Sequence, residues 1–99
     1  MEMNETRMAN LLSGVKLDSG ISSTSTIYDE RIKGKIHSVI SRMESEGIVI
    51  TDSFECDELI IAYSSWLWRS RDSMTGMPRS LRLALNNFLF HQKMKRSDS

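Results

Sequence analysis

Residues 57–94 limit most strongly what this chain can fold into. Two helical patterns cover this region, at about 54–71 and 78–94, and one turn at 72–77 joins them. Pro78 fits the first position of the second helix, where its missing N–H has no partner to lose. Each pattern has apolar residues on more than one face, and such a helix lies either in a large core or against a partner. Because a chain of 99 residues buries only a modest core, we expect a partner.

The apolar residues of these two helices separate into a core face and a second stripe on each. The expected core-face residues are Cys56, Leu59, Ile60, Tyr63, Trp66 and Leu67 on the first helix and Leu81, Ala84, Leu85 and Phe88 on the second. The solvent side of the first helix is expected at Glu58, Ser65 and Arg69. The second stripes consist of Ile61, Trp68, Leu83, Phe90 and Met94. We predict that these five residues form contacts between subunits.

Two further helices are expected in the first half of the chain. One is short, at about 5–15, and the other runs from about 27 to 46, with Thr26 as its N-cap and Gly47 as its C-terminal stop. The core face of the longer helix is expected at Tyr28, Ile32, Ile36, Val39, Ile40 and Met43. Its opposite side carries the small residues Gly34, Ser38 and Ser41. These three residues are further candidates for a subunit interface, where another helix approaches closely, unless the face is simply solvated.

The sequence therefore predicts one all-α domain over residues 1–99, a small bundle of three main helices plus a short N-terminal helix. Residues 18–26 are expected to form a linker, and the β-branched run 48–50 an extended segment inserted into the core. The ends, 1–4 and 95–99, are expected to be flexible. No apolar run reaches the roughly 18 residues that a membrane span needs, so we expect no membrane partner.

Charge is divided unevenly along a chain whose net charge is zero. Residues 1–65 hold eleven acidic and six basic side chains, a balance of −5, whereas residues 66–99 hold two acidic and seven basic ones, a balance of +5. Such asymmetry indicates either nucleic acid near the C-terminal third or head-to-tail contact between copies, unless solvated charges simply fell unevenly. The candidates for facing a partner or DNA are Arg79, Arg82, Lys93, Lys95 and Arg96.

Residue patterns that carry catalysis or bind metal are absent from the sequence. The single Cys56 excludes an internal disulfide, and its place on an apolar face is typical of a buried thiol. His37 and His91 lie on different helices with no carboxylate or thiol in a ligand spacing. The sequence has no glycine-rich phosphate loop and no G-x-S-x-G motif. We therefore expect a protein that is not an enzyme and has no cofactor and no metal.

Nucleic-acid binding is the alternative that the residues leave open. Arg79, Arg82, Asn86 and Lys93 share one face of the last helix, and Arg and Asn are common readers of base edges in a major groove. The last two helices and their turn then form a helix-turn-helix. Against this, a recognition helix normally presents a polar face, whereas Leu83 and Phe90 flank the arginines here.

The order of motifs along the chain also resembles a known family. The motifs are YDERIxxxI at 28–36, SEGI at 45–48, DELIIAY at 57–63, WLWR at 66–69 and MPRxLRxALNN at 77–87. This sequence is similar to the small head–tail connector proteins, also called adaptor or head-completion proteins, of tailed phages and prophages. The resemblance covers roughly residues 8–94 and consists mostly of helical patterning plus the WLWR and MPRxLR stretches.

The resemblance implies a structural role in the virion. Such a connector is all-helical, is made in the host cytoplasm, and assembles as a homo-oligomeric ring beneath the portal, expected to match the portal's symmetry. It extends the DNA channel toward the tail, where a stopper or tail-completion protein follows and packaged DNA passes non-specifically. It has no enzyme activity and no cofactor. A ring interface uses two different patches on each subunit, which accounts for the second apolar stripes. The family's portal contacts map to residues 90–96.

Overall fold

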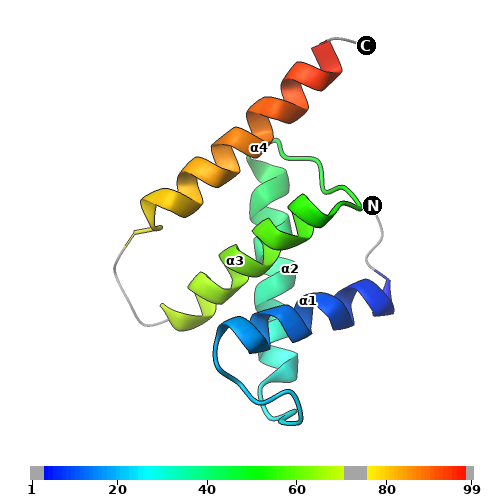
Figure 1. Ribbon diagram of the computed structural model, residues 1–99, viewed down its shortest axis with the longest axis vertical. Helices are drawn as coiled ribbons and strands as arrows, with labels where there is room; N and C mark the ends of the chain where they lie inside the picture. The colour runs from blue at the N-terminus through cyan, green and yellow to red at the C-terminus, as the bar shows by residue number, and fades with distance from the viewer. Residues whose placement is uncertain (1–3, 71–75, 98–99) are drawn as a thin grey trace.

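The computed structural model of the chain describes residues 4–70 and 76–97, and within those ranges all regular secondary structure is helical (Figure 1). The helices are α1 (Glu5–Asp18), α2 (Asp29–Ser45), α3 (Phe54–Arg69) and α4 (Arg79–Ser97). This confirms the predicted all-α fold. Helix α1, with 14 residues, is longer than expected, and α4 continues beyond its expected end at 94. Residues 1–3, 71–75 and 98–99, which include much of the predicted turn and ends, lie outside the described residues.

Helix α3 is the centre of the fold. It contacts α1, α2 and α4, and in Figure 1 it crosses in front of α2, with α1 on one side and α4 on the other. The hydrophobic core that these contacts enclose consists of Leu11, Val15, Ile32, Ile36, Val39, Met43, Ile48, Ile50, Cys56, Ile60, Tyr63, Trp68, Leu81 and Leu85. Most expected core-face residues are therefore buried, and Ile40, Leu59, Trp66, Leu67, Ala84 and Phe88 are half-buried at its edge. Tyr28, also expected on the core face, is instead 40% exposed, because it precedes the first turn of α2.

Local hydrogen bonds at the helix ends explain where the elements begin and stop. Ser53 caps α3, because its side chain accepts a hydrogen bond from the Cys56 N–H at 3.2 Å. The predicted cap Thr26 is wrong. Tyr28 occupies the N-cap of α2 without a side-chain hydrogen bond, because a turn from Thr26 to Asp29 precedes the helix.

The end of α2 is closed at Gly47, as the sequence predicts. Its φ of 95° lies in the left-handed region that favours glycine. The Gly47 N–H donates to the carbonyl of Glu44 and the Ile48 N–H to that of Met43, which is the Schellman arrangement. The same motif directs the chain into the core, because Ile48 and Ile50 are buried whereas Val49 between them is half-exposed. The expectation of an extended segment inserted at 48–50 is confirmed.

Two buried cations attach α1 and the linker to the rest of the chain. The Arg7 guanidinium donates to Oδ1 of Asp57 in α3 at 2.6 and 3.0 Å and to the carbonyl oxygen of Thr51 at 2.6 Å. The Lys16 ammonium donates to Oδ1 of Asp29 at 3.0 Å and to the carbonyl oxygen of Ser25 at 2.5 Å. A buried charge is stable only with such partners, so these two contacts fix where α1 lies.

The position of α1 overturns the prediction that α3 has a second exposed stripe. Ile61 lies against Gly14 of α1, so closely that a Cβ at Gly14 would be 2.5 Å from Cδ1 of Ile61. Trp68 is only 7% exposed, and its ring meets Tyr28 edge-on at a centroid distance of 5.5 Å. Ser65, expected on the solvent side, is fully buried. The chain itself therefore covers the faces of α3 that the sequence left for a partner.

Candidate functional site

The outer side of α4 carries the largest apolar stripe left uncovered on a helix of the described chain. Leu83, Phe90 and Met94 are 50%, 60% and 50% exposed, whereas Leu81 and Leu85 on the opposite side of the same helix are buried. The three exposed residues recur at spacings of seven and four, so they form one line along the helix. We call Leu83, Phe90 and Met94 the α4 stripe. The prediction that this stripe lies away from the core of the monomer is confirmed.

The basic residues of α4 border this stripe and differ in their exposure and in their ion pairing. Arg79, Lys93 and Lys95 are exposed. Arg82 instead donates to both carboxylate oxygens of Glu46, at 2.8 and 3.3 Å, at the end of α2. The hydrogen bond that Arg82 donates to Glu46 is the main reason that the pKa of the Arg82 guanidinium is raised above its ordinary value. Arg82 thus serves first to hold α4 on α2. The side chain of Arg96 lies outside the described residues.

A basic groove that the sequence interpretation missed lies between α2 and the C-terminal end of α3. Arg31, Lys35 and Arg42 of α2 line it, and its volume is about 470 Å³. None of these three cations has an ion-pair partner within the described residues. They recur at four and seven residues, which places them on one side of the helix.

The floor of this groove brings together three predicted interface residues, Gly34 and Ser38 of α2 and Trp68 of α3. Leu67 of α3, expected on the core face, lies beside them. Nothing lies within 4 Å of a Cβ built at Gly34, so the groove is open at that point. We call the site formed by these four residues with Arg31, Lys35 and Arg42 the α2 groove. The third predicted small residue, Ser41, is exposed and does not line it.

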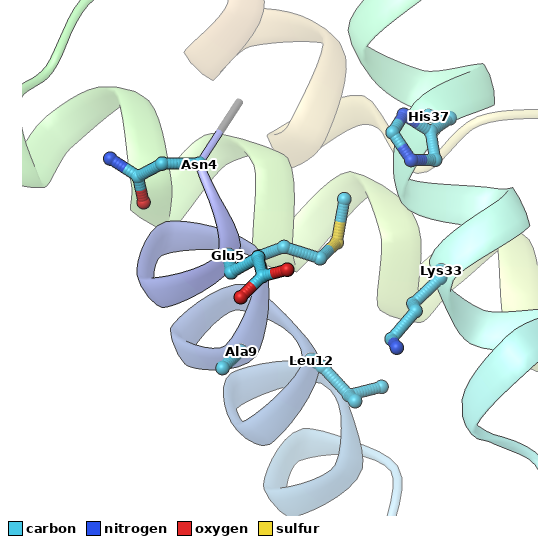
Figure 2. Close-up of a pocket in the computed structure, with 7 residues that line it drawn as sticks. Asn4, Glu5, Ala9, Leu12, Lys33 and His37 are labelled. Carbon is cyan, nitrogen blue, oxygen red and sulfur yellow. The ribbon is translucent and has the colours of Figure 1, made fainter. Parts of the chain in front are cut away.

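A second hollow lies between α1 and α2, with a volume of about 440 Å³ (Figure 2). Leu12 of α1 and Lys33 of α2 point toward one another across it, and Glu5 and His37 lie at its edge. Lys33 makes an ion pair with Glu30 at 3.5 Å. His37, Lys33 and Glu5 are not joined to one another by a hydrogen bond or ion pair, so they do not form an acid–base site. Within the described ranges, no group of three or more His, Cys, Asp and Glu residues could hold a metal ion.

Three further side chains that could act as nucleophiles are buried. Cys56 is fully buried, and the hydroxyls of Ser64 and Ser65 lie in the interior of α3 without a hydrogen-bond partner among the described residues. No helix in the described part of the chain is long and apolar enough to cross a membrane. The exposed surfaces, rather than any interior site, therefore carry the chemistry available to a partner.

Comparison with protein-family models, curated proteins and solved structures finds no match to this chain. The fold and the surfaces define a small all-helical protein with a central α3, an exposed apolar stripe on α4 and a basic groove on α2.

Proposed function

We propose that this protein is a structural head–tail connector of a tailed phage or prophage, which assembles as a ring beneath the portal and extends the DNA channel toward the tail. The observation that carries the proposal is the α4 stripe, where Leu83, Phe90 and Met94 are each at least half exposed on the helix that packs farthest from α1. An apolar line of this kind marks a contact with another protein. The all-helical fold and the motifs at 28–36, 66–69 and 77–87 agree with the family that the sequence resembles.

In this role, the α4 stripe meets the portal or the neighbouring subunit, and the exposed Arg79, Lys93 and Lys95 border the contact. The expected partners are further copies of the chain, the portal, the stopper or tail-completion protein, and DNA that passes without sequence recognition. The work is mechanical, so the proposal includes no catalytic step and no cofactor. The protein then resides at the head–tail junction of the virion, after assembly in the host cytoplasm.

Three variants test the proposal with the portal encoded in the same genome. Leu83→Glu and Phe90→Glu are expected to abolish attachment to the portal, because burial of a charge in a desolvated interface raises the free energy of the complex. Leu17→Glu is the matched control, since Leu17 is 84% exposed at the end of α1, outside the α4 stripe. Negative-stain images and co-sedimentation with the portal provide the measurement. Attachment that survives both α4 substitutions, or that Leu17→Glu abolishes equally, would contradict the assignment.

The helix-turn-helix alternative is less compatible with the geometry. The segment between α3 and α4 runs from 70 to 78, whereas the turn of this motif spans roughly three or four residues. Arg82, which would read bases, is held by Glu46. Any DNA binding is therefore expected to be non-specific and to vanish as salt approaches physiological concentration. A footprint on one defined sequence that persists at that salt would favour the regulator instead.

A further inference from the structure

The first residue of α3 is an exposed aromatic side chain among carboxylates. Phe54 is 75% exposed, although a phenyl ring gains by burial. Asp52, Glu55 and Glu58 surround it in sequence and are exposed as well. None of these three carboxylates makes an ion pair within the described residues, while the nearby Asp57 is taken by Arg7. We call Phe54 with these three carboxylates the Phe54 knob.

The α2 groove has the complementary character. Its rim holds three cations without ion-pair partners and no carboxylate, and its floor is the open surface at Gly34 beside Trp68. Like charges four residues apart, such as Arg31 and Lys35, disfavour a helix unless an anion lies nearby. Two carboxylates of α2 are paired elsewhere, since Asp29 binds Lys16 and Glu30 binds Lys33, and the third, Glu44, does not line the groove. The groove thus lacks a counter-charge among the described residues of one chain.

The knob and the groove lie at opposite ends of the same helix. Phe54 begins α3, and the groove residues Leu67 and Trp68 come from its last turn. Fourteen residues of helix at 1.5 Å each separate Phe54 from Trp68 by about 21 Å. The two ends of α3 are visible on opposite sides of the molecule in Figure 1. One copy cannot fill its own groove, but two different patches on opposite sides allow a chain of copies to close into a ring.

We propose that copies of this chain join head to tail, with the Phe54 knob of one copy seated in the α2 groove of the next. This inference rests on the proposed ring and names the contact that builds it. The groove volume of about 470 Å³ lies within the range that holds whole small ligands, so a phenyl ring fits over Gly34 and beside the half-buried Leu67. Arg31, Lys35 and Arg42 then face the carboxylates of the knob, and the cations also gain from the ring face.

Charge reversal on both sides gives a selective test. The groove variant is Arg31→Glu with Arg42→Glu, and the knob variant is Glu55→Lys with Glu58→Lys. All four positions are exposed, so both variants should keep the helical spectrum and melting temperature of the wild type. Each variant alone opposes like charges and should lower the association constant by about tenfold or more. Phe54→Ala should weaken association without any change of charge.

An equimolar mixture of the two variants provides the decisive measurement. Each groove then meets a knob of opposite charge, so association should return to within about twofold of the wild type, with the two variants alternating. Sedimentation velocity at low ionic strength follows this, and added salt should weaken both the wild type and the mixture. Variants that associate alone as the wild type does, or a mixture that stays dissociated, would overturn the contact.

Further outcomes separate this contact from the connector proposal. If the wild-type chain stays monomeric at every concentration while the α4 substitutions still abolish portal attachment, the contact is wrong and the connector stands. If the groove variant loses binding to a random-sequence duplex but associates normally, the groove holds nucleic-acid phosphates and the contact is again wrong. If the portal does not bind the wild type and association still follows the charges, only the connector proposal fails.

Discussion

The side-chain amide of Gln92 hydrogen-bonds both backbone groups of Val49. Nε2 donates to the Val49 carbonyl oxygen at 2.7 Å, and Oε1 accepts from the Val49 N–H at 3.0 Å. These are the two hydrogen bonds that a neighbouring strand would offer to an extended residue. Near the start of α4, Arg82 binds Glu46 in a similar two-point contact. Two attachments of α4 beyond its packing on α3 are therefore polar and near the surface.

Substitution of Gln92 should release the second half of α4. In Gln92→Glu the side chain keeps its size but loses the donor, and a carboxylate oxygen then faces the Val49 carbonyl. We expect a loss of about 1 kcal/mol in the free energy of unfolding and faster amide hydrogen exchange after residue 88. Asn87→Asp is the control, because it adds the same charge to an exposed position. Equal exchange rates in the two variants would mean that the Gln92 contact contributes nothing.

The glycines at positions 14 and 34 should respond oppositely to alanine. Gly34→Ala meets nothing within 4 Å, so the gain in helix propensity should stabilise the fold by up to about 1 kcal/mol. Gly14→Ala places a Cβ 2.5 Å from Cδ1 of Ile61, so that side chain must move and the gain is lost.

Truncation of Ile61 tests that reason directly. In Gly14→Ala with Ile61→Val the clashing methyl group is gone, so the double variant should be more stable than the sum of the two single changes. Thermal or urea unfolding of the four proteins completes the cycle. Additive effects would show that α1 and α3 do not meet at these residues.

Substitution by glutamate at positions 68, 83 and 85 should distinguish core positions from a surface position. Trp68→Glu and Leu85→Glu bury a charge at positions 7% and 1% exposed, and each should cost about 3 kcal/mol or more. Leu83→Glu, at a position 50% exposed, should change the free energy of unfolding by less than about 0.5 kcal/mol. Thermal melts followed by circular dichroism compare them. If Trp68→Glu melts like the wild type, Tyr28 and its neighbours do not enclose that ring.

Removal of the Asp57 carboxylate should loosen α1. The Arg7 guanidinium is buried and bonded to Asp57, so Asp57→Ala leaves a cation with fewer partners. The side chain of Asp57 is 32% exposed, so solvent screening limits the cost to about 1–3 kcal/mol. Asp52→Ala, at an exposed position just before α3, should have little effect. Proteolysis within residues 5–18 of the Asp57 variant, but not of the Asp52 variant, would report the release of α1.

The features that depend on near neighbours in the chain could be predicted from the sequence. Helical periodicity located α2, α3 and α4 to within a few residues, because side chains three and four apart share a face whatever lies around them. The stop at Gly47 and the inserted segment at 48–50 follow from glycine's left-handed backbone and from the turn it allows. Periodicity also placed Leu83, Phe90 and Met94 on one stripe, and the stripe stays exposed because no other helix among the described residues packs on that side of α4.

The sequence by itself determined which residues share a helix face, and the tertiary structure decided what each face meets. Periodicity marks Ile61 and Trp68 as a second apolar stripe, but only the position of α1 and of Tyr28 shows that the chain covers them itself. That position depends on the contact between Arg7 and Asp57, fifty residues apart, which no local pattern indicates. The α2 groove arises in the same way, because the three cations of α2 become a site only where the end of α3 closes their other side.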